Sequence, residues 1–185
     1  MSVAESGLSE ERYVIWDGDT ILYRPLTFFE GDKLIFTIHG NEYEIPYFET
    51  NRRLIGVDRT STGRKISAVS QHMPVEKKLF REMLHQIQST LGTDWRSGIR
   101  RAIENRSGWA LFSEYELFFD FVTAYHPHKM VECARRWYRG GSSCSPDQLH
   151  YLSWRASYVS FEEWDGSSRS LSHWLRTWRA ILRIV

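Results

Sequence analysis

The sequence is short of cysteine, of excess charge and of long apolar runs, and each shortage excludes a class of protein. Cys133 and Cys144 are the two cysteines among 185 residues, too few for a disulfide scaffold and without metal-site spacing. Lysine and arginine number 24 against 23 acidic residues, so no chain-wide basic surface for nucleic acid is expected. No segment approaches the roughly 18 apolar residues of a membrane span, and Met1–Gly7 is polar, unlike a secretory signal. We therefore expect a cytoplasmic protein with reduced thiols and no nucleic-acid partner.

What the sequence does contain is the composition of a globular domain with strands early and helices late. Hydrophobic residues make up 42% and aromatic residues 15%, which favours a sizeable buried core. Strands are predicted at 12–16, 21–23, 34–38, 66–69 and 156–161, with a loop over 51–65. Helices are predicted from Pro74 to Leu91, from Asp94 to Ile103, from Ser113 to His126, and over 130–138, 145–154 and 170–183. This order predicts an α/β class with a mixed sheet flanked by helices.

Two carboxylates directly follow the first predicted strand. The β-prone run Arg12–Trp16 stops at Asp17-Gly18-Asp19, and ligands of open α/β sheets bind at such strand ends. Neighbouring carboxylates repel each other unless a cation shares them, and Mg²⁺ or Mn²⁺ would leave positions open for phosphate oxygens. The pattern favours a divalent-metal site at Asp17 and Asp19, although Asp and Gly are also ordinary turn residues.

The segment Tyr13–Leu26 resembles the D-x-D-T segment of GT-A nucleotide-diphospho-sugar transferases. It is similar in particular to an uncharacterised bacterial glycosyltransferase-like family. Two further blocks match in order and spacing, Ser70–Pro74 and Ser113–Leu117, so that the resemblance runs to about Phe161. Tyr23, between the apolar pair and the basic residue of the motif, is a small departure from the family pattern.

The resemblance implies a partial GT-A, Rossmann-like fold that transfers a sugar from a nucleotide-sugar donor to a glycan or lipid-linked acceptor. Asp17 and Asp19 would hold Mn²⁺ or Mg²⁺ on the donor diphosphate, where the metal neutralises charge on the leaving group. Glu114 would act as general base on the acceptor hydroxyl. The substrate-binding residues implied are Thr20, His72 and Tyr115.

Structural roles compete with these assignments. Glu116 lies three residues after Ser113, the spacing of a capping box, so we interpret it as a capping residue. Glu114 falls in the first helical turn, where the helix dipole stabilises a carboxylate whatever its role. A lone His72 before a helix started by proline also fits a purely structural role.

The stretch ahead of the acidic turn is short for a GT-A enzyme. The resemblance implies a nucleotide-binding half ahead of the D-x-D strand, and one βαβ unit of such a half needs about 30 residues. Only Met1 to Trp16 precede Asp17 here. We expect weak or no transferase activity from this chain alone, with the missing half absent or supplied by another chain. Residues 1–11 are expected to be disordered, 12–165 to form the glycosyltransferase-like domain, and 166–185 to form a basic amphipathic helix.

A phosphatase of the haloacid dehalogenase type is the alternative enzyme. Asp17 would then be the nucleophile that forms an aspartyl-phosphate, and Asp19 the acid/base. That motif requires Gly and then Thr after the second Asp. Here Thr20 follows directly and Ile21 occupies the Thr position, which argues against it.

A non-catalytic membrane-surface or scaffold module is the third reading. The C-terminal segment 166–185 carries four arginines and no acid, together with Trp174 and Trp178. Such a helix suits an anionic membrane, here the inner face, although it also fits simple docking on the core.

Overall fold

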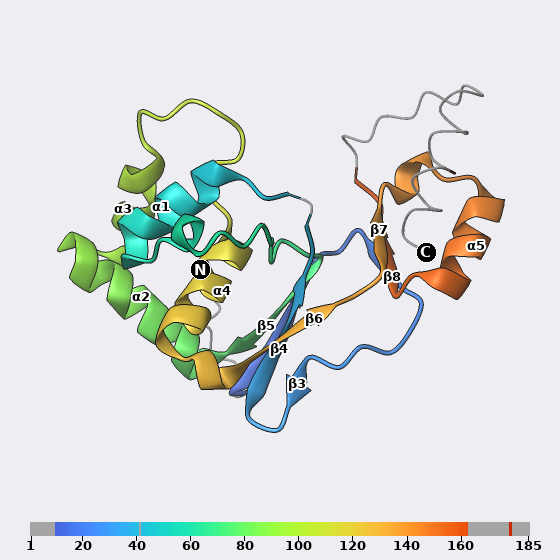
Figure 1. Ribbon diagram of the computed structural model, residues 1–185, viewed down its shortest axis with the longest axis horizontal. Coiled ribbons are helices and arrows are strands. Elements are labelled where there is room, and N and C mark those ends of the chain that lie inside the picture. Colours follow the sequence, from blue (N-terminus) through green and yellow to red (C-terminus); the bar gives the residue numbers. More distant parts are fainter. Residues whose placement is uncertain (1–9, 41, 163–177, 179–185) are drawn as a thin grey trace. The chain divides into compact units, whose positions relative to one another are not determined.

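The computed structural model describes residues 10–40, 42–162 and residue 178 (Figure 1). The fold is α/β, with small sheets flanked by helices, as the sequence predicts. The chain forms two compact units. The first takes residues up to Ile15 and Phe28–Cys133, and the second takes Trp16–Thr27 and residues from Ala134 on. The extent of the domain predicted over 12–165 stays a prediction.

The first unit holds two small sheets. One pairs β1 (Arg12–Trp16) with β5 (His72–Glu76), and the other has the order β3 (Phe29–Glu30), β4 (Lys33–Ile38), β6 (Met130–Ala134). Strands β3 and β4 form an antiparallel hairpin around Gly31, whose φ of 57° suits a residue without a side chain.

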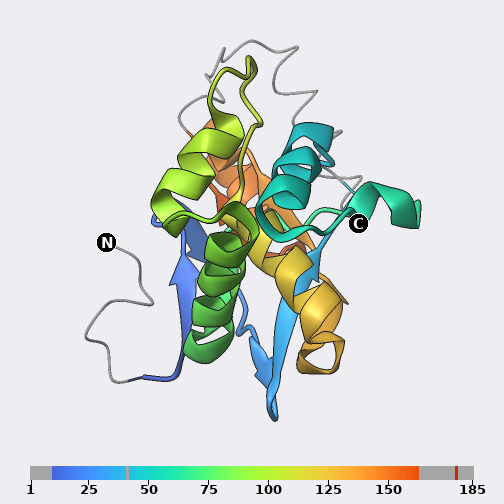
Figure 2. The ribbon, with the colours of Figure 1, turned by 90° about the vertical axis from the view of Figure 1, so that its left-hand side faces the viewer.

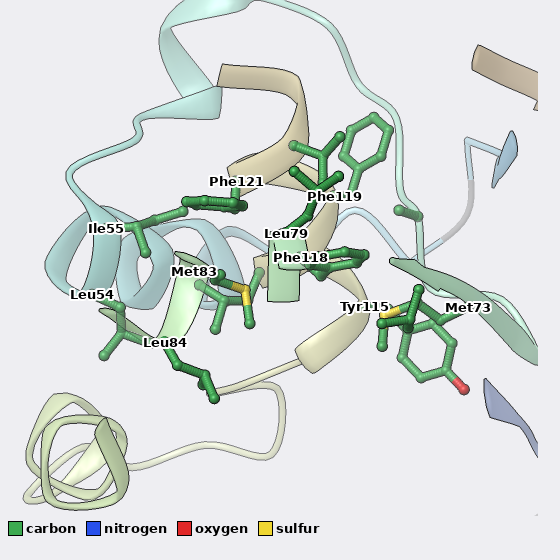
Figure 3. Close-up of a cluster of buried hydrophobic side chains, with 14 of the residues drawn as sticks. Leu54, Ile55, Met73, Leu79, Met83, Leu84, Tyr115, Phe118, Phe119 and Phe121 are labelled. Carbon is green, nitrogen blue, oxygen red and sulfur yellow. The ribbon is translucent and has the colours of Figure 1, made fainter. Parts of the chain in front are cut away.

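Four helices of the first unit gather on one side of its strands (Figure 1 and Figure 2). They are α1 (Ile45–Ile55), α2 (Lys77–Leu91), α3 (Trp95–Ile103) and α4 (Glu114–Tyr125). Helix α4 is buried without interruption from Tyr115 to Val122, because it is apolar around almost its whole circumference. Figure 3 shows how its aromatic side chains meet Leu79 and Met83 of α2 in the core.

The part of the second unit that the structure describes contains a three-stranded mixed sheet and helix α5 (Pro146–Arg155). Strand β8 (Tyr158–Ser160) lies between β2 (Thr20–Leu22), which is antiparallel to it, and β7 (Trp137–Arg139), which is parallel to it. The parallel pair needs a crossover connection, and α5 provides it. Leu152, Ala156 and Val159 form the buried centre of this unit.

Several predicted elements are wrong, and strand pairing explains those at Pro74 and over 130–138. Residues predicted as the loop 51–65 contain the end of α1 and a 3₁₀ turn, Arg59–Thr62. Pro74 lies inside β5, and α2 begins only at Lys77. The predicted helix over 130–138 is instead β6 and β7, whose strand neighbours come from elsewhere in the chain. The predicted strand at 66–69 is reduced to one bridge between Ser67 and His39.

The ends of the chain are largely outside the described residues. The predicted disordered N-terminus up to residue 9 and the predicted helix at 170–183 fall there, apart from Trp178. No helix in the described part of the chain has the length and apolar character needed to cross a bilayer.

Candidate functional site

The acidic turn, Asp17-Gly18-Asp19, joins β1 to β2 in the second unit. Its backbone is fixed at two points: the N–H of Thr20 donates to the carbonyl of Asp17 at 3.3 Å, and the N–H of Phe161 donates to that of Asp19 at 2.8 Å. The side chain of Asp19 is exposed and that of Asp17 is half-buried. The Thr20 hydroxyl lies 3.4 Å from Asp19 Oδ1 and donates to it. The turn therefore holds two carboxylates on an ordered backbone.

A divalent cation at this turn, shared with a substrate, stays a prediction. The carbonyls of Asp17 and Asp19 both accept main-chain hydrogen bonds. No group of three or more His, Cys, Asp or Glu side chains that could hold a metal occurs among the described residues. Mg²⁺ is commonly held by one or two carboxylates together with substrate phosphates and water, so two carboxylates are sufficient for such a site.

The other predicted site residues lie in the first unit. Glu114 is exposed at the first turn of α4, and its neighbour Tyr115 is 8% exposed and packs in the core (Figure 3). His72 is 1% exposed in β5, with Nε2 3.3 Å from the hydroxyl of Thr37 and its ring edge-on to that of Phe28. The structure thus brings Glu114 and Tyr115 together on one helix start and encloses His72 in the core. A joint site with the acidic turn stays a prediction.

Glu116 does not act as the capping residue that its spacing suggests. The hydroxyl of Ser113 accepts from the N–H of Glu116 at 3.3 Å, so the N-cap itself is confirmed. The Glu116 side chain points inward instead, where it is 0% exposed and accepts from Ser67 Oγ at 2.6 Å and from the N–H of Ala68 at 3.1 Å. A buried carboxylate requires donors and a counter-charge, and it finds both here.

The counter-charge is Arg59, which sequence reasoning missed. Its guanidinium is 6% exposed and lies 2.5 Å from Glu116 Oε2 and 2.5 Å from Asp120 Oδ1. Asn51 donates to the second oxygen of Asp120 at 2.7 Å. Burial raises the pKa of the Asp120 carboxyl to about 6, against the opposing effects of Arg59 and Asn51. We call Asn51, Arg59, Glu116 and Asp120 the buried charge cluster.

The profile of a family of unknown function, DUF6492, matches residues 3–170. The chain belongs to DUF6492. No curated protein matches the chain.

The DUF6492 match includes the acidic turn, the start of α4 and the buried charge cluster. The family's description names no activity, so the resemblance to GT-A transferases stays a prediction. One signal for the cluster was present in the sequence: Glu116 and Asp120 are four residues apart, on one face of an otherwise apolar helix. The residues around Arg59 gave no sign that it pairs with these carboxylates, because Arg59 and Glu116 are 57 positions apart in the sequence.

Proposed function

We propose that this DUF6492 protein is a metal-dependent glycosyltransferase that takes its sugar from a nucleotide-diphospho-sugar and passes it to a glycan or lipid-linked acceptor. The acidic turn carries the proposal. It presents the carboxylates of Asp17 and Asp19 at the end of β1, on a backbone held by Thr20 and Phe161. Such a turn suits Mn²⁺ or Mg²⁺, whose remaining positions take the oxygens of the donor diphosphate.

Each proposed role follows from the chemistry of the side chain. The bound cation would supply Lewis-acid stabilisation of the departing diphosphate. Asp17 and Asp19 hold that cation, and the Thr20 hydroxyl orients the Asp19 carboxylate. Glu114, exposed on the first turn of α4, is the proposed general base for the acceptor hydroxyl. We further propose that residues 166–185 hold the protein at the cytoplasmic face of a membrane.

Titration of the protein with Mn²⁺, alone and with uridine diphosphate, tests the metal site. Calorimetry should show binding by the wild type, loss of at least tenfold in affinity for Asp19→Asn, and no loss for Asp147→Asn. Asp147 is the matched control, because it is an exposed aspartate of the same unit, in the first turn of α5. Equal heats from all three proteins would contradict a metal site at the turn.

An activity assay tests the reaction. Hydrolysis or transfer by the purified chain, dependent on Mn²⁺ and lost in Asp19→Asn, would establish the transferase but contradict our expectation that the chain alone is weak or inactive. Hydrolysis of an aryl phosphate that disappears in Asp17→Asn would replace the transferase with the phosphatase alternative.

A further inference from the structure

A basic pocket lies in the second unit, at one end of its small sheet. The pocket has a volume of about 480 Å³, within the roughly 300–1,000 Å³ range of small-molecule sites. Its lining consists of Arg24, Ala134, Arg135, Arg136, Trp154, Arg155 and Ser157. No acidic side chain of the described residues lines it, so four arginines border one open space. We call it the arginine pocket.

The walls of the arginine pocket are fixed by main-chain hydrogen bonds. The carbonyl of Ser157 accepts from the N–H groups of Tyr23 at 2.9 Å and Arg24 at 3.2 Å, and the N–H of Ser157 donates to the carbonyl of Arg136 at 2.7 Å. These bonds join the segments that follow β2 and precede β7 and β8. Two of the side chains are also tied to backbone: Arg24 donates to the carbonyl of Trp154, and Arg135 to that of Thr27. The pocket is therefore preformed.

The charges in the pocket select for an anion with several oxygens. Guanidinium groups remain protonated at any physiological pH, so the protein cannot relieve their mutual repulsion by losing protons. An anion between them does relieve it, and the planar fork of arginine matches the geometry of phosphate oxygens. Trp154, which is 66% exposed, adds a large aromatic face on which the ring of a ligand can lie.

The arginine pocket and the acidic turn lie at opposite ends of β2. Asp19 precedes the strand and is bonded to Phe161, whereas Arg24 follows it and is bonded to Ser157. Asp19 and Arg24 are five positions apart, which corresponds to roughly 15 Å of extended chain. A diphosphate on a cation at the turn could not also fill the arginine pocket, so the two are separate sites.

We propose that the arginine pocket binds the phosphate groups of a small phosphorylated ligand, with a ring of that ligand on Trp154. Pyrophosphate is the minimal probe, and a nucleoside diphosphate is the probe that also carries a ring. The inference does not rest on the proposed function, because binding here requires no metal and no carboxylate of the acidic turn.

Calorimetry with pyrophosphate, with all divalent metal chelated, tests the site. The variants are Arg136→Gln and Arg155→Gln, because both side chains are exposed and their loss should leave the fold intact. The matched control is Arg101→Gln, which removes the same charge from an exposed position on α3. We expect each pocket variant to weaken binding at least tenfold and the control to leave it unchanged. Equal affinities, or no binding by the wild type, would overturn the proposal.

Two further measurements test whether Trp154 binds the ring of the ligand and whether the phosphate belongs to a soluble molecule or to a lipid. Trp154→Ala should weaken the binding of adenosine diphosphate more than the binding of pyrophosphate. Equal weakening of both would show that Trp154 does not bind the ring. If a variant fails to fold, the indole N–H signal of Trp154 in the wild type should still shift on addition of pyrophosphate, and an unmoved signal would count against the site. Cosedimentation with phosphatidylglycerol vesicles that depends on Arg136, without binding of soluble phosphates, would replace the small ligand with a lipid headgroup and so refute the proposal.

Discussion

Removal of the buried Arg59 guanidinium should destabilise the protein far more than removal of an exposed one. Arg59→Met keeps a long apolar stem against the rings of Phe48 and Phe119, which lie 4.6 and 4.7 Å from the guanidinium carbon. It removes the positive charge that lies within 4 Å of both carboxylates of the cluster. Glu116 and Asp120, which are 0% and 2% exposed, would then be buried without that counter-charge.

The expected loss follows from this burial. Breaking a buried ion pair by removal of one partner costs about 3–5 kcal/mol, a large part of a typical unfolding free energy of roughly 5–15 kcal/mol. Arg59 also donates to the carbonyl of Ile66 at 3.2 Å, so the segment after the 3₁₀ turn should loosen as well. We expect Arg59→Met to lower the unfolding free energy by about 3 kcal/mol or more.

Urea denaturation at neutral pH measures this loss, and Arg64→Met is the matched control. Arg64 pairs with Glu132 at 2.5 Å, but its side chain is 51% exposed, so its loss should amount to about 1 kcal/mol or less. Adding Glu116→Gln and Asp120→Asn to Arg59→Met should restore part of the stability, because the two buried carboxylates without a counter-charge are then neutral. Equal and small losses from the two arginine variants would refute the argument from burial.

Three smaller predictions concern single positions. Burial raises the pKa of Asp120 from 3.8 to about 6, so ionisation of this carboxyl opposes folding. Between about pH 4 and pH 7.5 the unfolding free energy of the wild type should therefore fall by up to about 3 kcal/mol relative to that of Asp120→Asn. A difference in urea midpoint that stays constant with pH would contradict this. Ser113→Ala removes the N-cap of α4 and should lower the unfolding free energy by about 1 kcal/mol, whereas Ser113→Asp should not. Gly141→Ala should lower the melting temperature, with a cost of about 1–3 kcal/mol, since the added carbon would lie 2.8 Å from side-chain atoms of Val159 and Phe161; an unchanged melting curve would show that this packing yields easily.

Local signals in the sequence predicted both ends of α3, the C-terminal end of α2 and the start of α5. Asp94 caps α3 by accepting from the N–H groups of Arg96 and Ser97, and Gly92 ends α2 with a φ of 62°. Ser145 and Gln148 form a complete capping box on α5. Each of these features depends on a few consecutive residues, so sequence alone contains the necessary information.

Features that depend on distant segments were missed or assigned wrongly. Pro74 resembles a helix start, yet it lies in β5 because that strand pairs with β1 near the beginning of the chain. In the same way Glu116 has capping-box spacing, but its side chain is taken by Ser67 and Arg59. Of the candidate site, the acidic turn is present where the sequence predicted it, with its carboxylates on an ordered backbone. Its relation to Glu114 depends on long-range assembly that no local pattern encodes.

The pairing of β2 with β8 has a consequence for biosynthesis. Thr20 pairs with Ser160, so the strand that follows the acidic turn leaves the ribosome well before its partner exists. At typical translation rates of about 5–20 residues per second, the nascent turn waits on the order of ten seconds for the strand that orders it. During that interval β2 lacks the strand with which it pairs, so this sheet of the second unit can form only after Ser160 has left the ribosome.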